Sequence, residues 1–109
     1  MAIAAIIAAH YDEPLSVEHL ARTVALSRYE LSRRFTQTMG RSMRAYLVEC
    51  RIERARALLL DGERSITDIA HSIGFGDLPR FDKVFRARVG CSPSAFRAAA
   101  RHPATAQNY

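Results

Sequence analysis

The side chains best suited to chemistry are cations on a short stretch near the C-terminus. Phe81 and Phe85 are four residues apart, so they share one face of a predicted helix. Arg80, Lys83 and Arg86 fall on the opposite face. Guanidinium groups match the geometry of phosphates and of guanine edges. The pattern is typical of a helix that packs through one face and presents charge to a polyanion, although a solvated surface helix gives the same pattern.

The composition agrees with a polyanionic partner. The chain has 109 residues and a formal net charge of +5, and Lys83 is its only lysine. This charge favours a nucleic acid only weakly, because many small proteins are basic. With 49% hydrophobic and 25% charged residues, the sequence predicts one globular unit, or two very small ones that share a core.

Metal and catalytic chemistry have little support in the sequence. Cys50 and Cys91 lie in no C-x-x-C motif, and the four histidines form no ligand pair at helical spacing. We therefore predict no metal and no cofactor, and two buried, reduced thiols rather than a disulfide. No nucleophile–base pair and no paired carboxylates stand out, so we do not expect an enzyme. Residues 2–9 are too few for a membrane span and follow no basic segment, which predicts a cytoplasmic protein without a membrane partner.

Capping residues divide the sequence into seven predicted helices, which makes the fold class all-α. Serines that fit N-cap positions are Ser16, Ser27, Ser65 and Ser92. Glycines that fit helix ends are Gly40, Gly74 and Gly90. A first helix in residues 2–10 is followed by a helix-turn-helix at about 16–40, a connecting helix at about 42–60, a second helix-turn-helix at about 65–90, and a last helix to about residue 100. Residues 101–109 show no periodicity and are predicted to be a C-terminal tail.

The two helix-turn-helix segments resemble each other loosely. A helix-turn-helix places its second helix in the major groove, and two such units on one face of DNA are about 34 Å apart. A connecting helix of roughly 18 residues would be about 27 Å long, which is of that order. We therefore expect this helix to hold two reading helices in successive major-groove segments. A simple central helix of a bundle would give the same sequence pattern.

The chain from about Tyr11 to Arg97 resembles the DNA-binding domain of the AraC/XylS family of bacterial transcription regulators. The residues that carry the resemblance are Leu31, Arg33, Phe35 and Gly40 in the first segment, Arg51, Ile52, Glu53, Ala55, Leu58, Leu59 and Leu60 in the connecting helix, and Ile69, Ala70, Gly74, Phe75, Asp77, Phe81, Phe85, Arg86, Gly90, Ser92, Pro93, Phe96 and Arg97 in the second segment. The resemblance implies one domain over residues 1–100, with sequence-specific binding of double-stranded promoter DNA. It also implies contact with RNA polymerase, as in an activator, and an N-terminal sensing domain in many longer relatives.

In the first segment, the resemblance assigns base reading to Tyr29, Ser32 and Arg33. Arginine bound to guanine through two hydrogen bonds is the commonest specific contact, which favours Arg33, although a phosphate contact or a solvated charge would also explain it. Tyr29 could touch a thymine methyl or a sugar, or could simply cover the helix end. Contacts to the DNA backbone are expected from Arg28, Thr36 and Gln37.

In the second segment, the reading face would comprise Leu78, Pro79, Asp82 and Lys83, with backbone contacts from Arg80 and Arg86. Family members often carry a polar residue in place of Pro79 and an arginine in place of Lys83. Asp82 could accept a hydrogen bond from cytosine N4 or repel phosphates. This segment is therefore expected to position the backbone more than to read bases.

Two further expectations complete the sequence reading. The family usually has a glycine where this chain has Ala25, so a positive φ there would cost alanine about 1 kcal/mol. The alternative to a DNA-binding domain is a helical protein-interaction module without specific DNA binding. A related enzyme class, DNA-alkylation repair, is disfavoured because the cluster of zinc-binding cysteines is missing from the sequence.

Overall fold

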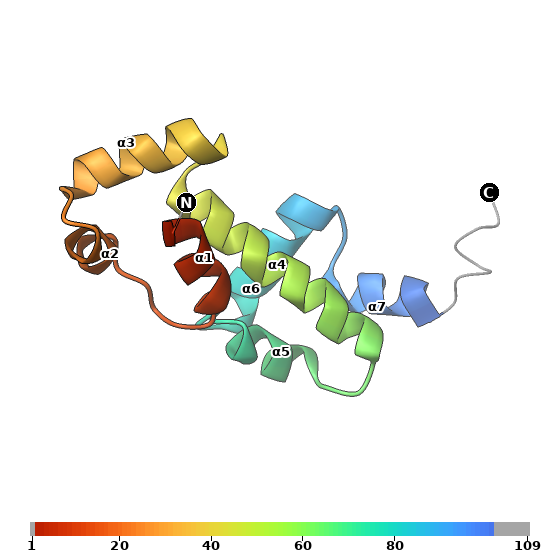
Figure 1. Ribbon diagram of the computed structural model, residues 1–109. Coiled ribbons are helices and arrows are strands. Elements are labelled where there is room, and N and C mark those ends of the chain that lie inside the picture. The colour runs from red at the N-terminus through yellow and green to blue at the C-terminus, as the bar shows by residue number, and fades with distance from the viewer. Residues whose placement is uncertain (1, 102–109) are drawn as a thin grey trace. The chain divides into compact units, whose positions relative to one another are not determined.

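The computed structural model describes residues 2–101, which form seven α-helices and no strand (Figure 1). The helices are α1 Ala2–Ala9, α2 Val17–Thr23, α3 Arg28–Met39, α4 Met43–Asp61, α5 Ile66–Ser72, α6 Leu78–Val89 and α7 Pro93–Arg101. The order is the one that the sequence predicts. Arg101, which the sequence analysis assigns to the tail, is the last residue of α7, and the rest of the predicted tail lies outside the described residues.

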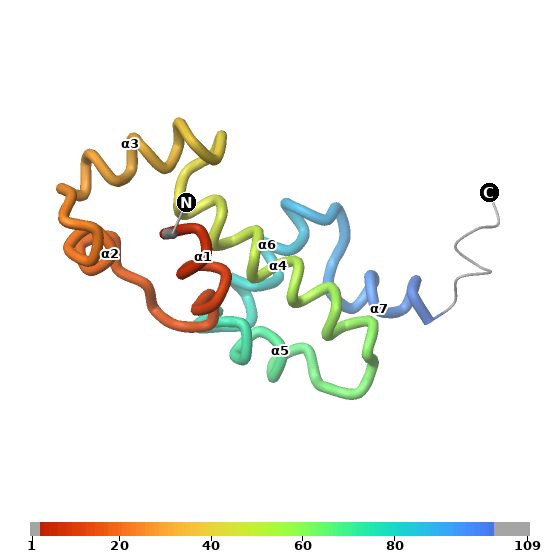
Figure 2. Tube along the Cα trace, in the orientation of Figure 1, coloured from red at the N-terminus to blue at the C-terminus, as the bar shows by residue number. Residues whose placement is uncertain are grey.

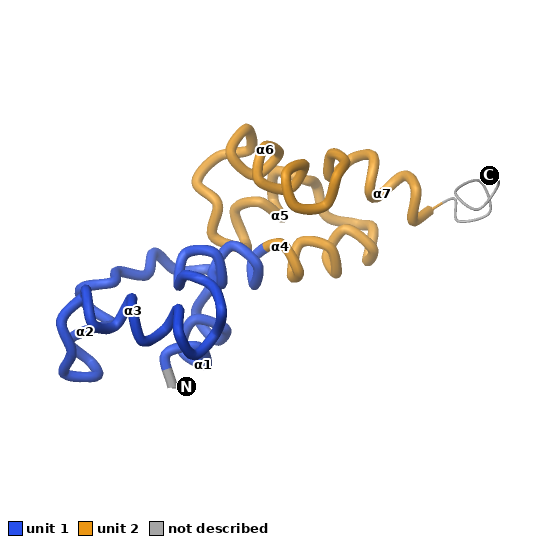
Figure 3. Tube along the Cα trace, turned by 90° about the horizontal axis from the view of Figure 1, so that it is seen from above, with its two compact units in different colours: residues 1–51 blue, residues 52–109 orange. Residues whose placement is uncertain are grey.

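The chain divides into two compact units, and their boundary lies inside α4 (Figure 3). The first unit comprises residues 1–51 and the second comprises residues 52–109. Since α4 is continuous over 19 residues, it supplies core residues to both units. Each unit therefore contains one helix-turn-helix and one part of the long helix.

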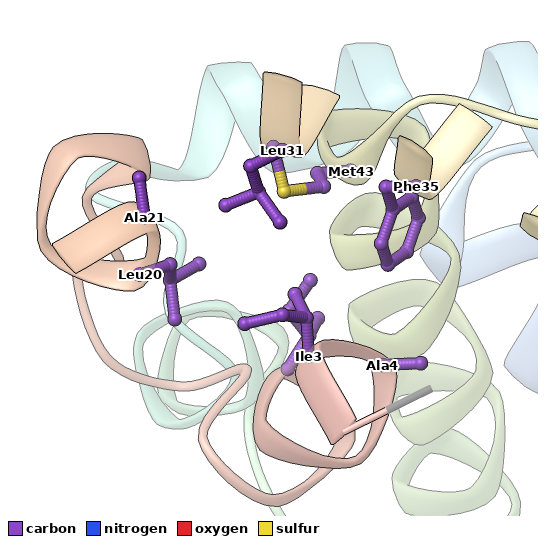
Figure 4. Packing of buried hydrophobic residues seen from close by; sticks show 8 residues of the cluster. Ile3, Ala4, Leu20, Ala21, Leu31, Phe35 and Met43 are labelled. Carbon is purple, nitrogen blue, oxygen red and sulfur yellow. The ribbon is translucent and has the colours of Figure 1, made fainter. Parts of the chain in front are cut away.

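The first unit has its own hydrophobic core, which brings together α1, α2, α3 and the beginning of α4 (Figure 4). Leu31 and Phe35 are fully buried and lie one turn apart on α3. Burial of one such side chain contributes about 1.5–3 kcal/mol, so these two residues fix which face of α3 remains exposed. The other buried members are Ile3, Ala4, Ile7, Leu20, Ala21 and Met43.

The second unit is built around a series of aromatic rings. Phe81 contacts Phe75 and Phe85 with centroid distances of 5.4 and 5.6 Å, and Phe85 contacts Phe96 at 5.6 Å. Arg97 of α7 donates a hydrogen bond from Nε to the Leu59 carbonyl of α4 at 3.2 Å. The rings join α6 to α7, and the hydrogen bond joins α7 to the second part of α4. The remaining buried apolar residues of this unit are Ile52, Ala55, Leu58, Leu59, Ile69, Ala70, Ile73 and Pro93.

The two units repeat the same local motif in α2–α3 and in α5–α6, whose places along the chain are marked in Figure 2. Ser16 and Ser65 both cap the first helix by accepting a hydrogen bond from the amide three residues later. Gly40 and Gly90 end the second helix in the left-handed conformation, with φ of 77° and 99°. Equivalent positions pair one to one, except that the second turn contains one additional residue, Gly76.

The turns between the paired helices are Schellman motifs, in which a residue with positive φ follows the first helix. In the second unit this residue is Gly74, with φ of 101°. In the first unit it is Ala25, with φ of 57°, and among residues 2–101 it is the one non-glycine residue with positive φ. The expectation that Ala25 occupies a glycine position is confirmed.

The two cysteines are both free in the part of the chain that the structure describes. Cys50 and Cys91 are free but half-buried, so the prediction of fully buried thiols is wrong. Cys50 lies on the edge of the first unit's core rather than inside it, and its burial raises the pKa of its thiol.

No helix between residues 2 and 101 is long and apolar enough to cross a membrane, and this range contains no group of three or more residues that could hold a metal ion.

Candidate nucleic-acid interface

α3 is held with a fixed exposed face because both its ends are capped. The Ser27 hydroxyl accepts a hydrogen bond from the Glu30 amide at 3.0 Å, and Gly40 donates its amide to the Thr36 carbonyl at 2.9 Å. Leu31 and Phe35 face the core. The residues on the opposite side of α3 must then face outward.

The outward face of α3 contains a shallow hollow, which we call the α3 hollow. It is lined by Tyr29, Ser32, Arg33, Thr36 and Gln37. These are the three predicted base-reading residues of the first unit and two of its predicted backbone contacts. Tyr29 is 75% exposed, which is unusual for a large aromatic ring in a protein that has a core to bury it. The structure thus gathers these five predicted residues on one surface.

The arginines of α3 differ in their partners. Arg33 is exposed and forms no ion pair with any residue between 2 and 101. Its neighbour Arg34 pairs with Glu30 at 3.4 Å. Arg28, a predicted backbone contact, also forms an ion pair, because its guanidinium lies 2.9 Å from the Glu18 carboxylate of α2. Arg33 is therefore the arginine of α3 whose charge is available to a ligand.

Glu18 is suited to hold Arg28 because it stays ionised. Its carboxylate is exposed and lies in the first turn of α2. The backbone amide of Glu18 itself, the Ser16 hydroxyl and the Arg28 guanidinium lower the pKa of the Glu18 carboxyl below its ordinary value. The pair positions Arg28 beside the start of α3 without burying either charge.

α6 presents the second predicted reading face in the same way but with other residues. Asp77 caps the helix by accepting a hydrogen bond from the Arg80 amide at 2.8 Å, and Phe81 and Phe85 are fully buried. Lys83 is exposed and has no ion pair among the described residues. Arg80 is likewise exposed.

The start of α6 is apolar. Leu78 is 38% exposed, and it lines a hollow together with Pro79 and Asp82 of α6. The rest of this hollow comes from Ile66 of α5 and from the first two residues of α7, Pro93 and Ser94. The structure brings three of the four predicted reading residues of the second unit together here, while Lys83 is not part of the lining.

Asp82 has a partner within its own helix. Its Oδ2 lies 2.7 Å from Nε of Arg86, one turn later. From the sequence, Asp82 is expected to accept from cytosine or to repel phosphates, and Arg86 is expected to contact the backbone. In the structure each neutralises the other, an i,i+4 pairing that the spacing could have revealed.

One residue that matters for the interface was missed by sequence reasoning. From the sequence, Arg51 is only a member of the family pattern, without an assigned role, and in the structure it is only 9% exposed. Its Nε donates to the Tyr11 carbonyl at 2.6 Å and its Nη2 donates to the Glu13 carbonyl at 3.3 Å. It fixes the connector between α1 and α2, and so the start of the first helix-turn-helix. The only signal in the sequence was its place in the family pattern.

The chain is similar in sequence and in structure to proteins of one family. A family model described as a helix-turn-helix domain matches residues 20–99. The HTH-type transcriptional regulator ArgR of Pseudomonas aeruginosa is 36% identical over 85 residues, which cover 78% of this chain and 26% of that protein. A transcriptional regulator of Chromobacterium violaceum, described as containing an AraC-type DNA-binding domain, superposes with a TM-score of 0.80 at 34% identity and covers 91% of this chain and 88% of the other. The chain belongs to the AraC family of transcription regulators.

Within the AraC family, one structural relative is informative about the domain. The DNA-binding domain of AdpA, a global transcriptional factor solved in complex with a target DNA, has a TM-score of 0.85 and 32% identity, with 91% of this chain and 89% of that chain covered. The present chain carries the AraC-type DNA-binding domain with both helix-turn-helix units. It spans about a quarter of the length of the ArgR relative. The family consists of transcription regulators rather than enzymes.

Proposed function

We propose that this AraC-type domain binds double-stranded promoter DNA sequence-specifically, with α3 as the principal base-reading helix. The observation that carries the proposal is the α3 hollow, where an unpaired arginine and a largely exposed tyrosine lie on one rigid helix face. Arg33 would bind guanine through O6 and N7, and Ser32 would contact a neighbouring base edge. Thr36 and Gln37, at the edge of the same face, would contact the adjoining backbone.

α6 would act mainly through the DNA backbone. Leu78 and Pro79 have no side-chain hydrogen-bonding group, and the Asp82 carboxylate is occupied by Arg86. Lys83 and Arg80 are exposed cations of the predicted contact face that can bind phosphates. On this view the first unit supplies specificity, and the second unit supplies affinity that falls with salt.

The sharpest test compares two neighbouring arginines of α3. Arg33→Ala should weaken binding to a selected site by about 1–3 kcal/mol and relax the preference at one base pair. Arg34→Ala removes the same charge from an adjacent position that is already paired with Glu30, so it should leave the base preference unchanged. Gel-shift titration of both variants against the selected site and its single-base variants measures the difference. Equal effects of the two substitutions on base preference would contradict the assignment to Arg33.

The continuous α4 supports a second element of the proposal, in which the two reading helices enter successive major-groove segments. Its 19 residues correspond to about 28 Å. Insertion of two residues into the exposed part of α4 around Arg54 would rotate the following residues by about 200°. Affinity for the selected site should then fall towards that of a single unit. Unchanged affinity would show that α4 does not set the register.

The partners of the whole protein also belong to this proposal. We expect contact with RNA polymerase, a sensing domain N-terminal to this one in a longer parent chain, and localisation to the nucleoid. The support for a longer parent chain is the small share of each relative that this chain covers, which is 26% for ArgR and 30% for the melibiose operon regulatory protein of Escherichia coli K12.

A protein-interaction module is the second candidate function, and the apolar start of α6 favours it. Leu78 and Pro79 are exposed and Ile66 is half-buried beside them, so these residues offer carbon surface where a DNA-reading helix would offer donors. Selection from a randomised duplex pool separates the two functions. Binding that disappears above about 200 mM salt with no enriched sequence would favour the interaction module.

A further inference from the structure

The surface of the α3 hollow has a property that residue types alone do not predict. Four of its five residues are polar, yet most of the surface they expose in the hollow is carbon. A phenol ring, a threonine methyl and the aliphatic stem of an arginine can supply this carbon. A purely polar ligand would leave such a surface unmatched.

The major groove offers one apolar group on its base edges, which is the C5-methyl of thymine. We infer that the α3 hollow recognises a thymine methyl next to the guanine bound by Arg33, an inference that rests on the proposed function and defines the base step it reads. The unpaired guanidinium and the carbon surface lie in the same hollow, so the guanidinium can bind the guanine while the carbon surface contacts the thymine methyl. The ring of Tyr29 is the group that would contact the methyl, while Thr36 lies two turns further along α3 and keeps its expected contact with the backbone.

Helix geometry sets how far apart the two bases lie. Tyr29 and Arg33 are one turn apart, which is about 6 Å along the axis of α3. Successive base pairs are about 3.4 Å apart. The thymine should therefore lie within two base pairs of the guanine. A neighbouring unmethylated pyrimidine would leave the ring of Tyr29 against water.

The experiment replaces each thymine of a selected site, one at a time, by deoxyuridine. This change removes the methyl and keeps every hydrogen-bonding group of the base. Loss of one buried methyl should weaken binding about fourfold at one position, within two base pairs of the guanine whose substitution affects the wild type but not Arg33→Ala. Deoxyuridine elsewhere in the site should change the dissociation constant by less than about twofold.

Variants of the hollow assign the effect to its side chains. In Tyr29→Ala, the penalty for deoxyuridine at the sensitive position should shrink. Thr38→Ser is the control, since Thr38 is an exposed residue of α3 that does not line the hollow, and it should leave this penalty unchanged. Circular dichroism of each variant checks that the helix content is unchanged.

The possible outcomes separate the inference from the function on which it rests. A selected site that tolerates every deoxyuridine would overturn the inference and leave sequence-specific binding intact. A sensitive thymine whose penalty persists undiminished in Tyr29→Ala would also overturn it, because the methyl would then be read elsewhere. A randomised pool from which no sequence is enriched would contradict the proposed function itself.

Discussion

The turn of the first helix-turn-helix holds alanine in a conformation that favours glycine. Ala25 has a φ of 57°, its amide donates to the Arg22 carbonyl at 3.2 Å, and the Leu26 amide donates to the Ala21 carbonyl at 3.0 Å. These two bonds define the Schellman motif and require the left-handed residue between α2 and α3. We expect Ala25→Gly to stabilise the first unit.

The magnitude follows from two opposing terms. The left-handed conformation costs an L-residue about 1–2 kcal/mol, which glycine avoids. Glycine also lowers the free energy of unfolding by about 0.4–1 kcal/mol, because the unfolded chain gains conformational freedom. The side chain of Ala25 is exposed, so its removal sacrifices no core packing. The net gain in the free energy of unfolding should be about 0.5–1 kcal/mol, or a rise in Tm of about 2–6 °C.

Urea unfolding followed by circular dichroism measures this change, and Gly40→Ala is the converse control. Gly40 ends α3 with a φ of 77°, and a Cβ there would meet no atom within 4 Å. Its substitution should therefore lower the free energy of unfolding by about the same amount through the backbone alone. If Ala25→Gly instead lowered the midpoint as Gly40→Ala does, the argument from backbone strain would be refuted.

Three further changes test other contacts. Asp82→Asn should raise affinity for all DNA sequences about equally, because it frees Arg86 and removes a negative charge, and gel shifts at two salt concentrations measure it. Arg51→Met should lower the free energy of unfolding by about 1.5–3 kcal/mol in urea, since two carbonyls lose a charged donor. Burial raises the pKa of the Cys50 thiol, so in a Cys91→Ser variant alkylation at pH 8 should be slower than for free cysteine and should recover in urea. The same raised pKa contributes stability that is present below about pH 9 and is lost as pH rises further, which unfolding at pH 8 and pH 10 should show.

Local rules explain why the helices could be predicted from the sequence. Helix ends depend on a few residues whose chemistry is specific to that position, such as Ser27 at an N-cap and Gly90 in the left-handed conformation. The buried stripe of α6 follows from the four-residue spacing of Phe81 and Phe85. The positive φ at Ala25 was expected only through the family resemblance, since nothing in an alanine itself demands it.

The contacts that the sequence analysis missed depend on which partner a charged side chain finds in space. Arg51 has the same composition signature as any exposed helical arginine, and its burial is decided by the carbonyls of a connector some 40 positions earlier. Arg28 is predicted to contact phosphate, and its ion pair with Glu18 of the preceding helix could not be read from the charges of α3 alone. A pattern of charges along one helix cannot distinguish a free cation from one neutralised by another element.

The internal repeat gives the strongest reason to assign different roles to the two units. Because the caps, the turns and the buried rings correspond, the backbone presents equivalent positions on α3 and α6. Ser32 in the first unit corresponds to Asp82 in the second, and Arg33 corresponds to Lys83. The unpaired cation of α3 is an arginine, which can make two hydrogen bonds to one base, whereas the unpaired cation at the same position of α6 is a lysine with a single-point ammonium, and the carboxylate beside it is paired with Arg86. With the scaffold held constant, the difference in chemistry between the two faces comes from these exposed side chains, so exchanging them between the units should exchange their roles.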